Sequence, residues 1–259
     1  MCFKELFMYA EYNKSMRAFC IMLALLVPSL VSAFMTDEQI ALHQADTSAW
    51  SVGERIAFWA GQFIGTPYDT DPLGEYVRKK VLVADERVDC MYLTFRAVEL
   101  SVAKDPQEAL LIALDKRFRS RGLLNAGLVR NYEERFEYGE DMLDSGKWGR
   151  EITGELGRTR DIPGSRGRET VQMLTAENAA GSSALLHSGD IIYFVRQPSR
   201  RVSDEIVGHI GIIKKEAGKT YLIHASGLKN RGGRVKKTLL ADYLRTMPFA
   251  GIRVSRFAP

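Results

Sequence analysis

The stretch Val88-Asp89-Cys90-Met91-Tyr92-Leu93-Thr94-Phe95 predicts a helix that carries a cysteine in its first turn. Asp89 is a preferred N-cap residue, and apolar residues then recur at helical spacing as far as Leu100. A thiol at a helix start faces the positive end of the helix dipole and unpaired backbone N–H groups, which lower its pKa. The same N–H groups can hold an oxyanion. We therefore predict that Cys90 is a nucleophile; the structural alternative is a small buried hydrophobic residue.

The other two cysteines, Cys2 and Cys20, precede a predicted processing site. From Met16 the chain has an arginine, an apolar run and then Val31-Ser32-Ala33, the small-residue pattern of a signal-peptide cleavage site. Residues 1–33 are therefore predicted to be a signal peptide, with Met16 as an alternative start of translation. The protein is then expected in the periplasm or secreted, without a stable membrane span after processing.

Residues 34–259 are expected to form a single domain with one cysteine and hence no internal disulfide. Secreted domains often carry cysteines in pairs, so a lone cysteine favours a reactive thiol. The formal net charge of +4 suits an anionic polymer, but no dense basic block with interleaved aromatic residues indicates nucleic acid. The basic runs 196–201 and 229–237 are predicted to be solvated loops, with contact to substrate carboxylates as the alternative.

The first half of this domain is predicted to be helical. Thr36 and Ser51 each begin a capping-box pattern that opens a helix, and the second helix ends before Gly65-Thr66-Pro67-Tyr68. Asp105 followed by a proline predicts another helix, which runs to about Phe118.

Residues 119–186 are predicted to be an insertion, with a helix over about 131–143 and a Gly/Arg-rich loop at 157–168. The segment is too long for a simple connection in a compact domain, so we expect it to cover or shape a groove.

The last part of the chain is rich in branched and aromatic residues and predicts an antiparallel sheet. The expected strands cover residues 191–195, 206–214, 220–225 and 251–254, with a short helix at 239–244. Helices that carry the cysteine, followed by this sheet, predict an α+β fold.

His209 and His224 lie on neighbouring predicted strands. With a two-residue turn at Ala217-Gly218, the antiparallel register places Ser226 opposite His209 and Gly211 opposite His224. Residues that lie opposite each other, or two apart on one strand, share a face of the sheet. The two histidines are therefore predicted to be diagonal neighbours on one face, about 7 to 8 Å apart from backbone to backbone.

A base and an orienting group on a sheet, with a nucleophile on a helix, follow the logic of a catalytic triad. His209 would take the thiol proton from Cys90, and His224 would fix the tautomer of His209. Two histidines with fourteen residues between them and no HExxH helix make a zinc amidase the weaker alternative. No metal site and no cofactor are predicted.

Several short motifs, taken together and in this order, resemble the NlpC/p60-type papain-like cysteine peptidases and amidases, which cut bacterial peptidoglycan. Each motif is weak alone, and the set spans residues 50 to 259. The motifs are Gly65-Thr66-Pro67-Tyr68, Asp89-Cys90, Gly189-Asp190-Ile191, Gly208-His209-Ile210-Gly211 and Ile223-His224-Ala225-Ser226.

The segment from Phe136 to Thr153 is similar to one branch of this superfamily, the N-acetylmuramoyl-L-alanine amidase-like enzymes. The resemblance implies a papain-like fold, Cys90 as nucleophile, His209 as base and His224 as third member. It also implies that Tyr68 lies beside the thiol, where Tyr68 and Asp89 would line the substrate and oxyanion site.

The implied reaction removes the peptide from muramic acid in muropeptides, with a preference for anhydro-muropeptides, through a thioester. A DL-endopeptidase that cuts γ-D-glutamyl-diamino acid bonds is the alternative within this class. A non-catalytic periplasmic module that binds the cell wall with an idle thiol is the alternative outside it. The expected partner is therefore peptidoglycan or a muropeptide, and not nucleic acid.

Overall fold

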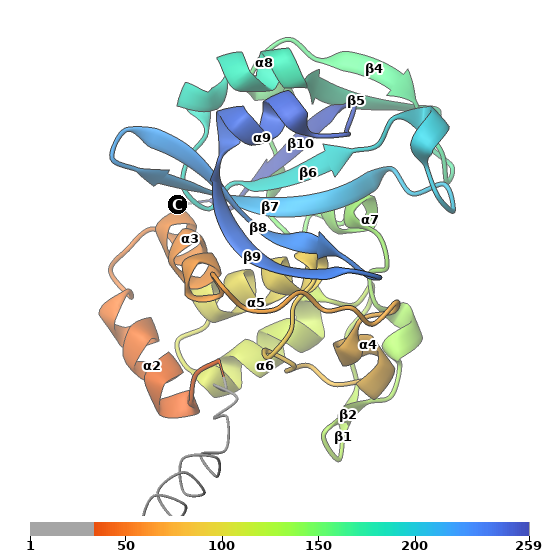
Figure 1. The fold of residues 1–259 in the computed structure, drawn as a ribbon. Coiled ribbons are helices and arrows are strands. Elements are labelled where there is room, and N and C mark those ends of the chain that lie inside the picture. Colours follow the sequence, from red (N-terminus) through yellow and green to blue (C-terminus); the bar gives the residue numbers. More distant parts are fainter. Residues whose placement is uncertain (1–33, 259) are drawn as a thin grey trace, which may run out of the picture. The chain divides into compact units, whose positions relative to one another are not determined.

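An antiparallel sheet in the order β4-β5-β10-β6-β7-β8-β9 forms the centre of the protein, and β3 also pairs with β10 (Figure 1). The computed structural model describes residues 34–258, so the predicted signal peptide lies outside the described residues. Helices precede the main strands, as expected for the predicted α+β class. The strands of this sheet are β3 (Arg150–Glu151), β4 (Arg160–Pro163), β5 (Thr170–Thr175), β6 (Ile191–Val195), β7 (Val207–Glu216), β8 (Lys219–Leu228), β9 (Gly232–Leu239) and β10 (Gly251–Arg256).

The helical half begins where the capping residues predict it. Thr36 forms a complete capping box with Gln39, and the Ser51 hydroxyl accepts the Glu54 N–H. No helix among residues 34–258 is long and apolar enough to cross a membrane. The helices of this half are α2 (Asp37–Asp46), α3 (Val52–Gln62), α4 (Glu75–Lys79), α5 (Cys90–Val102) and α6 (Pro106–Lys116).

Helices cover both faces of the sheet (Figure 1). On one face, α3 and α5 pack on inward side chains of β6 to β9, such as Ile210 and Ile223, in the main hydrophobic core. On the other face, α8 (Ala176–Gly181) and α9 (Leu240–Thr246) pack on the alternate residues, such as Phe194 and Leu222. This alternation follows from the two-residue period of a strand.

The predicted insertion at residues 119–186 differs from the expectation of a helical segment. It supplies β1 (Leu124–Asn125) and β2 (Leu128–Val129), which form a separate two-stranded sheet, and then β3, β4 and β5, which extend the central sheet. The helix expected over 131–143 is wrong in its extent. A single 3-10 turn at Tyr132–Glu134 and α7 (Gly139–Asp144) stand there instead. Between these two elements the chain is bound to the C-terminal end of α6, where the Phe136 N–H donates to the Arg117 carbonyl at 2.9 Å.

The basic run 229–237 is also not a loop throughout, because most of it lies in strand β9. Only residues 229–231 form the connection from β8. The β8–β9 ladder is continuous from Tyr221–Leu239 to Leu228–Gly232, and Val235 is the buried residue of the run. The prediction of a loop failed because one apolar residue among charges gives no visible alternation.

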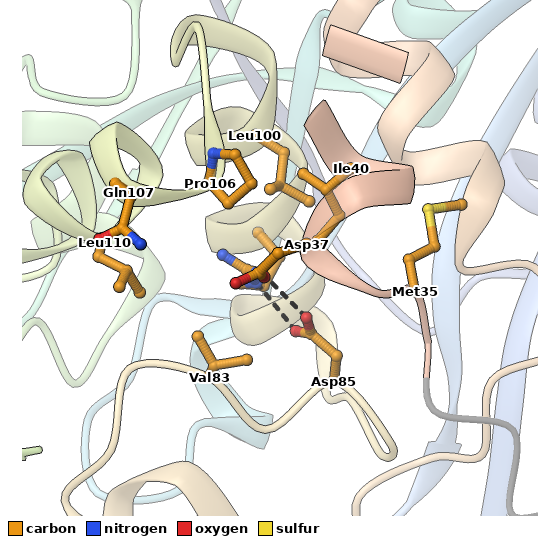
Figure 2. Close-up of a pocket in the computed structure, with 10 residues that line it drawn as sticks. Met35, Asp37, Ile40, Val83, Asp85, Leu100, Pro106, Gln107 and Leu110 are labelled. Atoms are coloured by element: carbon orange, nitrogen blue, oxygen red, sulfur yellow. Dashed lines mark hydrogen bonds and ion pairs between the residues drawn. The ribbon is translucent and has the colours of Figure 1, made fainter. Parts of the chain in front are cut away.

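Two buried ion pairs fix α5 to the segments around it. Arg96 and Asp85 form a bidentate pair with both N···O distances at 2.9 Å, and Arg117 binds Glu99 at 2.6 and 2.7 Å. Glu99 also lies 3.7 Å from Arg96, which links the two pairs. Asp85 also lines a pocket of about 200 Å³ with Arg96 and Leu100 of α5, and Figure 2 shows the side chains around it. The pocket is lined by Met35, Asp37, Ile40, Val83, Asp85, Arg96, Leu100, Pro106, Gln107 and Leu110.

Candidate active site

The β7–β8 hairpin places the two histidines. Its tip residues Ala217 and Gly218 have φ angles of 49° and 74°, as a type I′ turn requires. The ladder then runs from Glu216–Lys219 to Ile212–Ile223, which is the predicted register. A Cβ added to Gly211 would lie 3.2 Å from the His224 Cβ, so these two residues face each other as predicted.

The two imidazoles are in direct contact. His209 Nε2 lies 2.8 Å from His224 Nδ1, so one nitrogen donates to the other according to the tautomer. Phe194 and Phe249 stack on the His209 ring with interplanar angles of 28° and 8°. The predicted juxtaposition of the two histidines is therefore present in the structure.

Burial keeps both imidazoles neutral. It lowers the pKa of His209 to about 3, with smaller contributions from His224 and Arg196. It lowers the pKa of His224 to about 4, and the charge of Lys236 adds to the effect. At neutral pH the pair therefore has an acceptor nitrogen, as a general base needs.

Asp89 and α5 place the cysteine. The Asp89 Oδ1 accepts the Tyr92 N–H at 2.9 Å, so Asp89 is the N-cap and Cys90 the first helical residue. This matches the prediction from the sequence. Cys90 is half-buried and is the one cysteine among residues 34–258.

The thiol lies where the β7–β8 ladder ends. The Ile213 N–H donates toward the β6 side, to Asp190 at 2.9 Å, so the amides of Ile212 and Ile210 point toward β8. The ladder stops at Ile212. The Ile210 amide, next in sequence to His209, instead hydrogen-bonds to Cys90 and lowers the pKa of its thiol.

Contrary to the expectation from the helix start, the pKa of the Cys90 thiol is raised, to about 12. Burial is the main cause, and the negative charge of Asp89 adds to it. The Ile210 amide, the Lys229 charge and the Cys90 amide oppose the rise but do not outweigh it. The cost of removing the thiolate from water exceeds the stabilisation that the start of the helix provides, so the pKa rises instead of falling.

The Cys90 thiol lies near the amide of Ile210, the residue after His209, but within residues 34–258 it forms no hydrogen bond with either imidazole. Among the described residues, the imidazoles of His209 and His224 hydrogen-bond only to each other. The resting site therefore holds a neutral thiol beside a neutral base. Contacts between catalytic groups often tighten only when substrate binds.

Tyr68 lies beside the segment that leads into α5, where it forms a parallel bridge with Val88. Its N–H donates to Gly233 at 2.9 Å, and its ring lies on Gly227, where an added Cβ would come within 2.3 Å of a ring carbon. Burial and the negative charge of a Cys90 thiolate raise the pKa of its hydroxyl. Tyr68 therefore stays a proton donor.

Asp89 acts on the candidate site through its hydrogen bonds to Lys229 and to the first turn of α5. Its Oδ2 accepts from Lys229 Nζ at 3.2 Å, while its other oxygen caps α5. The Lys229 ammonium also lies 5.6 Å from the centre of the Tyr68 ring. A carboxylate accepts but does not donate hydrogen bonds, so Asp89 orients the N–H groups of α5 rather than binding an oxyanion itself.

Tyr243 on α9 is a site residue that the sequence analysis missed. Its ring centre lies 4.8 Å from that of His224 and 6.2 Å from that of His209. Burial raises the pKa of its hydroxyl, and the charge of a Cys90 thiolate adds to the rise. A tyrosine in a short amphipathic helix gives no signal of its own; only the packing of α9 on β8 reveals it.

A metal site is not formed by these groups. No cluster of three or more His, Cys, Asp or Glu side chains within residues 34–258 has a geometry that could hold a metal ion.

The sequence matches no model of a known protein family and no curated protein. Solved structures do match the fold. An N-acetylmuramoyl-L-alanine amidase from Bacteroides uniformis aligns with a TM-score of 0.61 at 18% identity, over 80% of this chain and 99% of its own. A Legionella pneumophila protein of the DUF1460 family aligns with a TM-score of 0.65 at 15% identity, over 86% of this chain and 94% of its own.

A Bacteroides fragilis protein provisionally described as a xylanase also aligns, with a TM-score of 0.58 at 17% identity, over 78% of this chain and all of its own. The activities named for these structures differ. At such identities the likeness establishes a shared fold and leaves the reaction to the chemistry of the site.

Proposed function

We propose that the protein is a bacterial peptidoglycan hydrolase that cleaves an amide bond with a Cys90, His209 and His224 triad. The observation that carries the proposal is the 2.8 Å contact between the two imidazoles, next to the helix that begins at Cys90. The fold shared with a structure named as an N-acetylmuramoyl-L-alanine amidase supports the substrate class.

The reaction begins with transfer of the thiol proton to His209 as sulfur attacks the carbonyl carbon. Because the pKa of the thiol is raised and that of His209 lowered, the transfer accompanies the attack rather than precedes it. The carbon–sulfur bond forms and the carbonyl oxygen becomes an oxyanion. His209 then gives the proton to the leaving nitrogen, the carbon–nitrogen bond breaks, and a thioester remains. Water activated by His209 releases the acid and restores the thiol.

Donors surround the place where the oxyanion forms. The Cys90 N–H lies at the start of α5, where backbone donors are unpaired. The protonated Tyr68 hydroxyl can donate a second hydrogen bond. The Ile210 amide stabilises the sulfur anion, because it hydrogen-bonds to Cys90. His224 orients the His209 ring through their shared hydrogen bond.

The bond we propose is the amide between N-acetylmuramic acid and L-alanine, in muropeptides and preferentially in anhydro-muropeptides. Purified muropeptides incubated with the protein should yield a product with a new L-alanine amino terminus, identified by mass spectrometry. A new diamino-acid terminus would assign the protein to the DL-endopeptidases. The Cys90→Ala and His209→Gln variants should yield no product, whereas an unchanged digest with Cys90→Ala would contradict the triad.

This substrate class fits export through residues 1–33, and we propose a periplasmic or secreted location. Mass spectrometry of the amino terminus of protein recovered from the periplasm tests it. Cleavage before Phe34 is the expected result, and an intact Met1 or Met16 terminus in the cytoplasmic fraction would contradict it.

A further inference from the structure

A row of cations follows strand β9 beside the histidine pair. Residues 229–237 contain five basic side chains and no acidic one. In the β8–β9 ladder, Lys236 is the partner of His224 and Arg234 is the partner of Ser226. Each of the two cations thus belongs to a defined cross-strand pair.

These pairs place the cations on the face of the sheet that carries the imidazoles. Residues directly opposite on antiparallel strands share a face, with Cβ atoms about 5 Å apart. Lys236 therefore lies beside His224, and Arg234 lies beside Ser226. The β7–β8 ladder ends at Ile212–Ile223, so His209 lies beyond it and reaches this row through its contact with His224. His224 is thus the histidine with a cation, Lys236, directly opposite it.

Arg234 and Lys236 differ from the lysines near them, Lys229 and Lys237, in their ion pairing. Arg234 and Lys236 are exposed, and within the described residues neither has an ion-pair partner. In contrast, Lys229 is paired with Asp89, and Lys237 is paired with Glu216. Lys237 follows Lys236 directly, so the period of the strand turns it to the opposite face.

We propose that Arg234 and Lys236 bind a carboxylate of the substrate close to the scissile amide. The inference rests on the proposed hydrolysis of muropeptides, whose peptides carry a free α-carboxylate on D-glutamate. Two residues that are two apart on a strand have Cα atoms about 7 Å apart, so both side chains can reach one carboxylate. An arginine offers two parallel N–H donors to such a group, and a lysine adds a point charge.

Arg234 and Lys236 therefore make the enzyme selective for substrates that carry a negative charge at this position. A peptide whose D-glutamate is amidated presents a neutral group and leaves the two cations without a partner. The wild-type protein should prefer the carboxylate form over the carboxamide form in kcat/KM by on the order of tenfold.

The first test does not depend on hydrolysis. Iodoacetate and iodoacetamide alkylate Cys90 by the same chemistry but differ in charge, so the ratio of their rate constants reports the positive field at the site. The Arg234→Gln/Lys236→Gln variant should lower this ratio on the order of fivefold. The effect should vanish in 1 M salt, where the Debye length is about 3 Å.

Lys237→Gln is the control for a general effect of charge, because it removes one positive charge from the position next to Lys236, on the opposite face. It should leave the ratio at the wild-type value. An equal fall with Lys237→Gln would mean a general effect of net charge. A fall with Lys229→Gln but not with the double variant would assign the carboxylate contact to Lys229. Either result overturns the proposal.

The second test uses paired muropeptides with D-glutamate or its α-amide. The wild-type protein and Lys237→Gln should favour the carboxylate form, and the double variant should cleave both forms equally. Cleavage of both forms at equal rates by the wild-type protein would overturn this inference but not the proposed function. Cleavage of neither form would overturn the proposed function, while the alkylation ratio would still test the cation pair.

Discussion

Acidification from pH 6.5 to pH 5 is expected to destabilise the folded protein through its two buried histidines. Burial lowers the pKa of His209 to about 3 and that of His224 to about 4, whereas an unfolded histidine has a pKa of about 6.5. Between these values the unfolded chain binds more protons than the folded one. The free energy of unfolding therefore falls as the pH falls through this window.

The size of the effect follows from proton linkage. From pH 6.5 to pH 5 an unfolded imidazole goes from about half protonated to almost fully protonated and a folded one gains almost no proton, which costs about 1.6 kcal/mol per histidine. His224 is only 4% exposed, but His209 is partly exposed and its contribution is smaller. We expect a loss of about 2 to 3 kcal/mol, a large fraction of the usual stability of a domain.

Urea unfolding at the two pH values measures this loss. The His209→Gln/His224→Gln variant has no imidazole in the pair, so its free energy of unfolding should change much less over the same interval. The His187→Gln variant replaces an exposed histidine and keeps the buried pair, so it should retain the wild-type loss. If the double variant loses as much stability as the wild type, the histidines are not buried as neutral groups and the reasoning is wrong.

Three further predictions follow from the packing. Glu99→Ala leaves Arg117 buried without its partner and should cost about 3 to 5 kcal/mol in urea unfolding, whereas Glu99→Met/Arg117→Leu should recover most of it. The rate of Cys90 alkylation by iodoacetamide should have its pH midpoint above the ordinary value of about 8.5, because burial raises the pKa of the thiol; a midpoint below 7 would contradict this. Gly227→Ala should displace the Tyr68 ring, lower kcat/KM for muropeptides and cost about 1 to 3 kcal/mol in thermal unfolding; a fully active variant would place Tyr68 outside the reaction.

The parts of the fold that local chemistry determines could be predicted from the sequence. Asp89 before an apolar helical pattern defined the start of α5, because a cap needs only a side chain and the next few amides. The turn at Ala217-Gly218 defined the register, and the register alone placed His209 and His224 on one face. Such features depend on neighbours that are close in sequence.

The remaining features depend on contacts between distant segments. Strand β5 finds its partner in β10, and no pattern within either strand identifies the other. Tyr243 joins the site only because α9 packs on β8. The pKa of Cys90 depends on how deeply α5 is buried, which the charge pattern of the first turn does not reveal.

The position of β10 in the middle of the sheet has a consequence for synthesis of the chain. Strands β4 and β5 are made early, but their link to β6 is β10, which ends at Arg256. Until β10 has been made, β4 and β5 form an isolated two-stranded hairpin, which is marginal in water and has an open edge. Folding of this half therefore waits for β10, and a chain that ends before residue 251 would keep both histidines yet present an unpaired edge on β6 to other nascent chains.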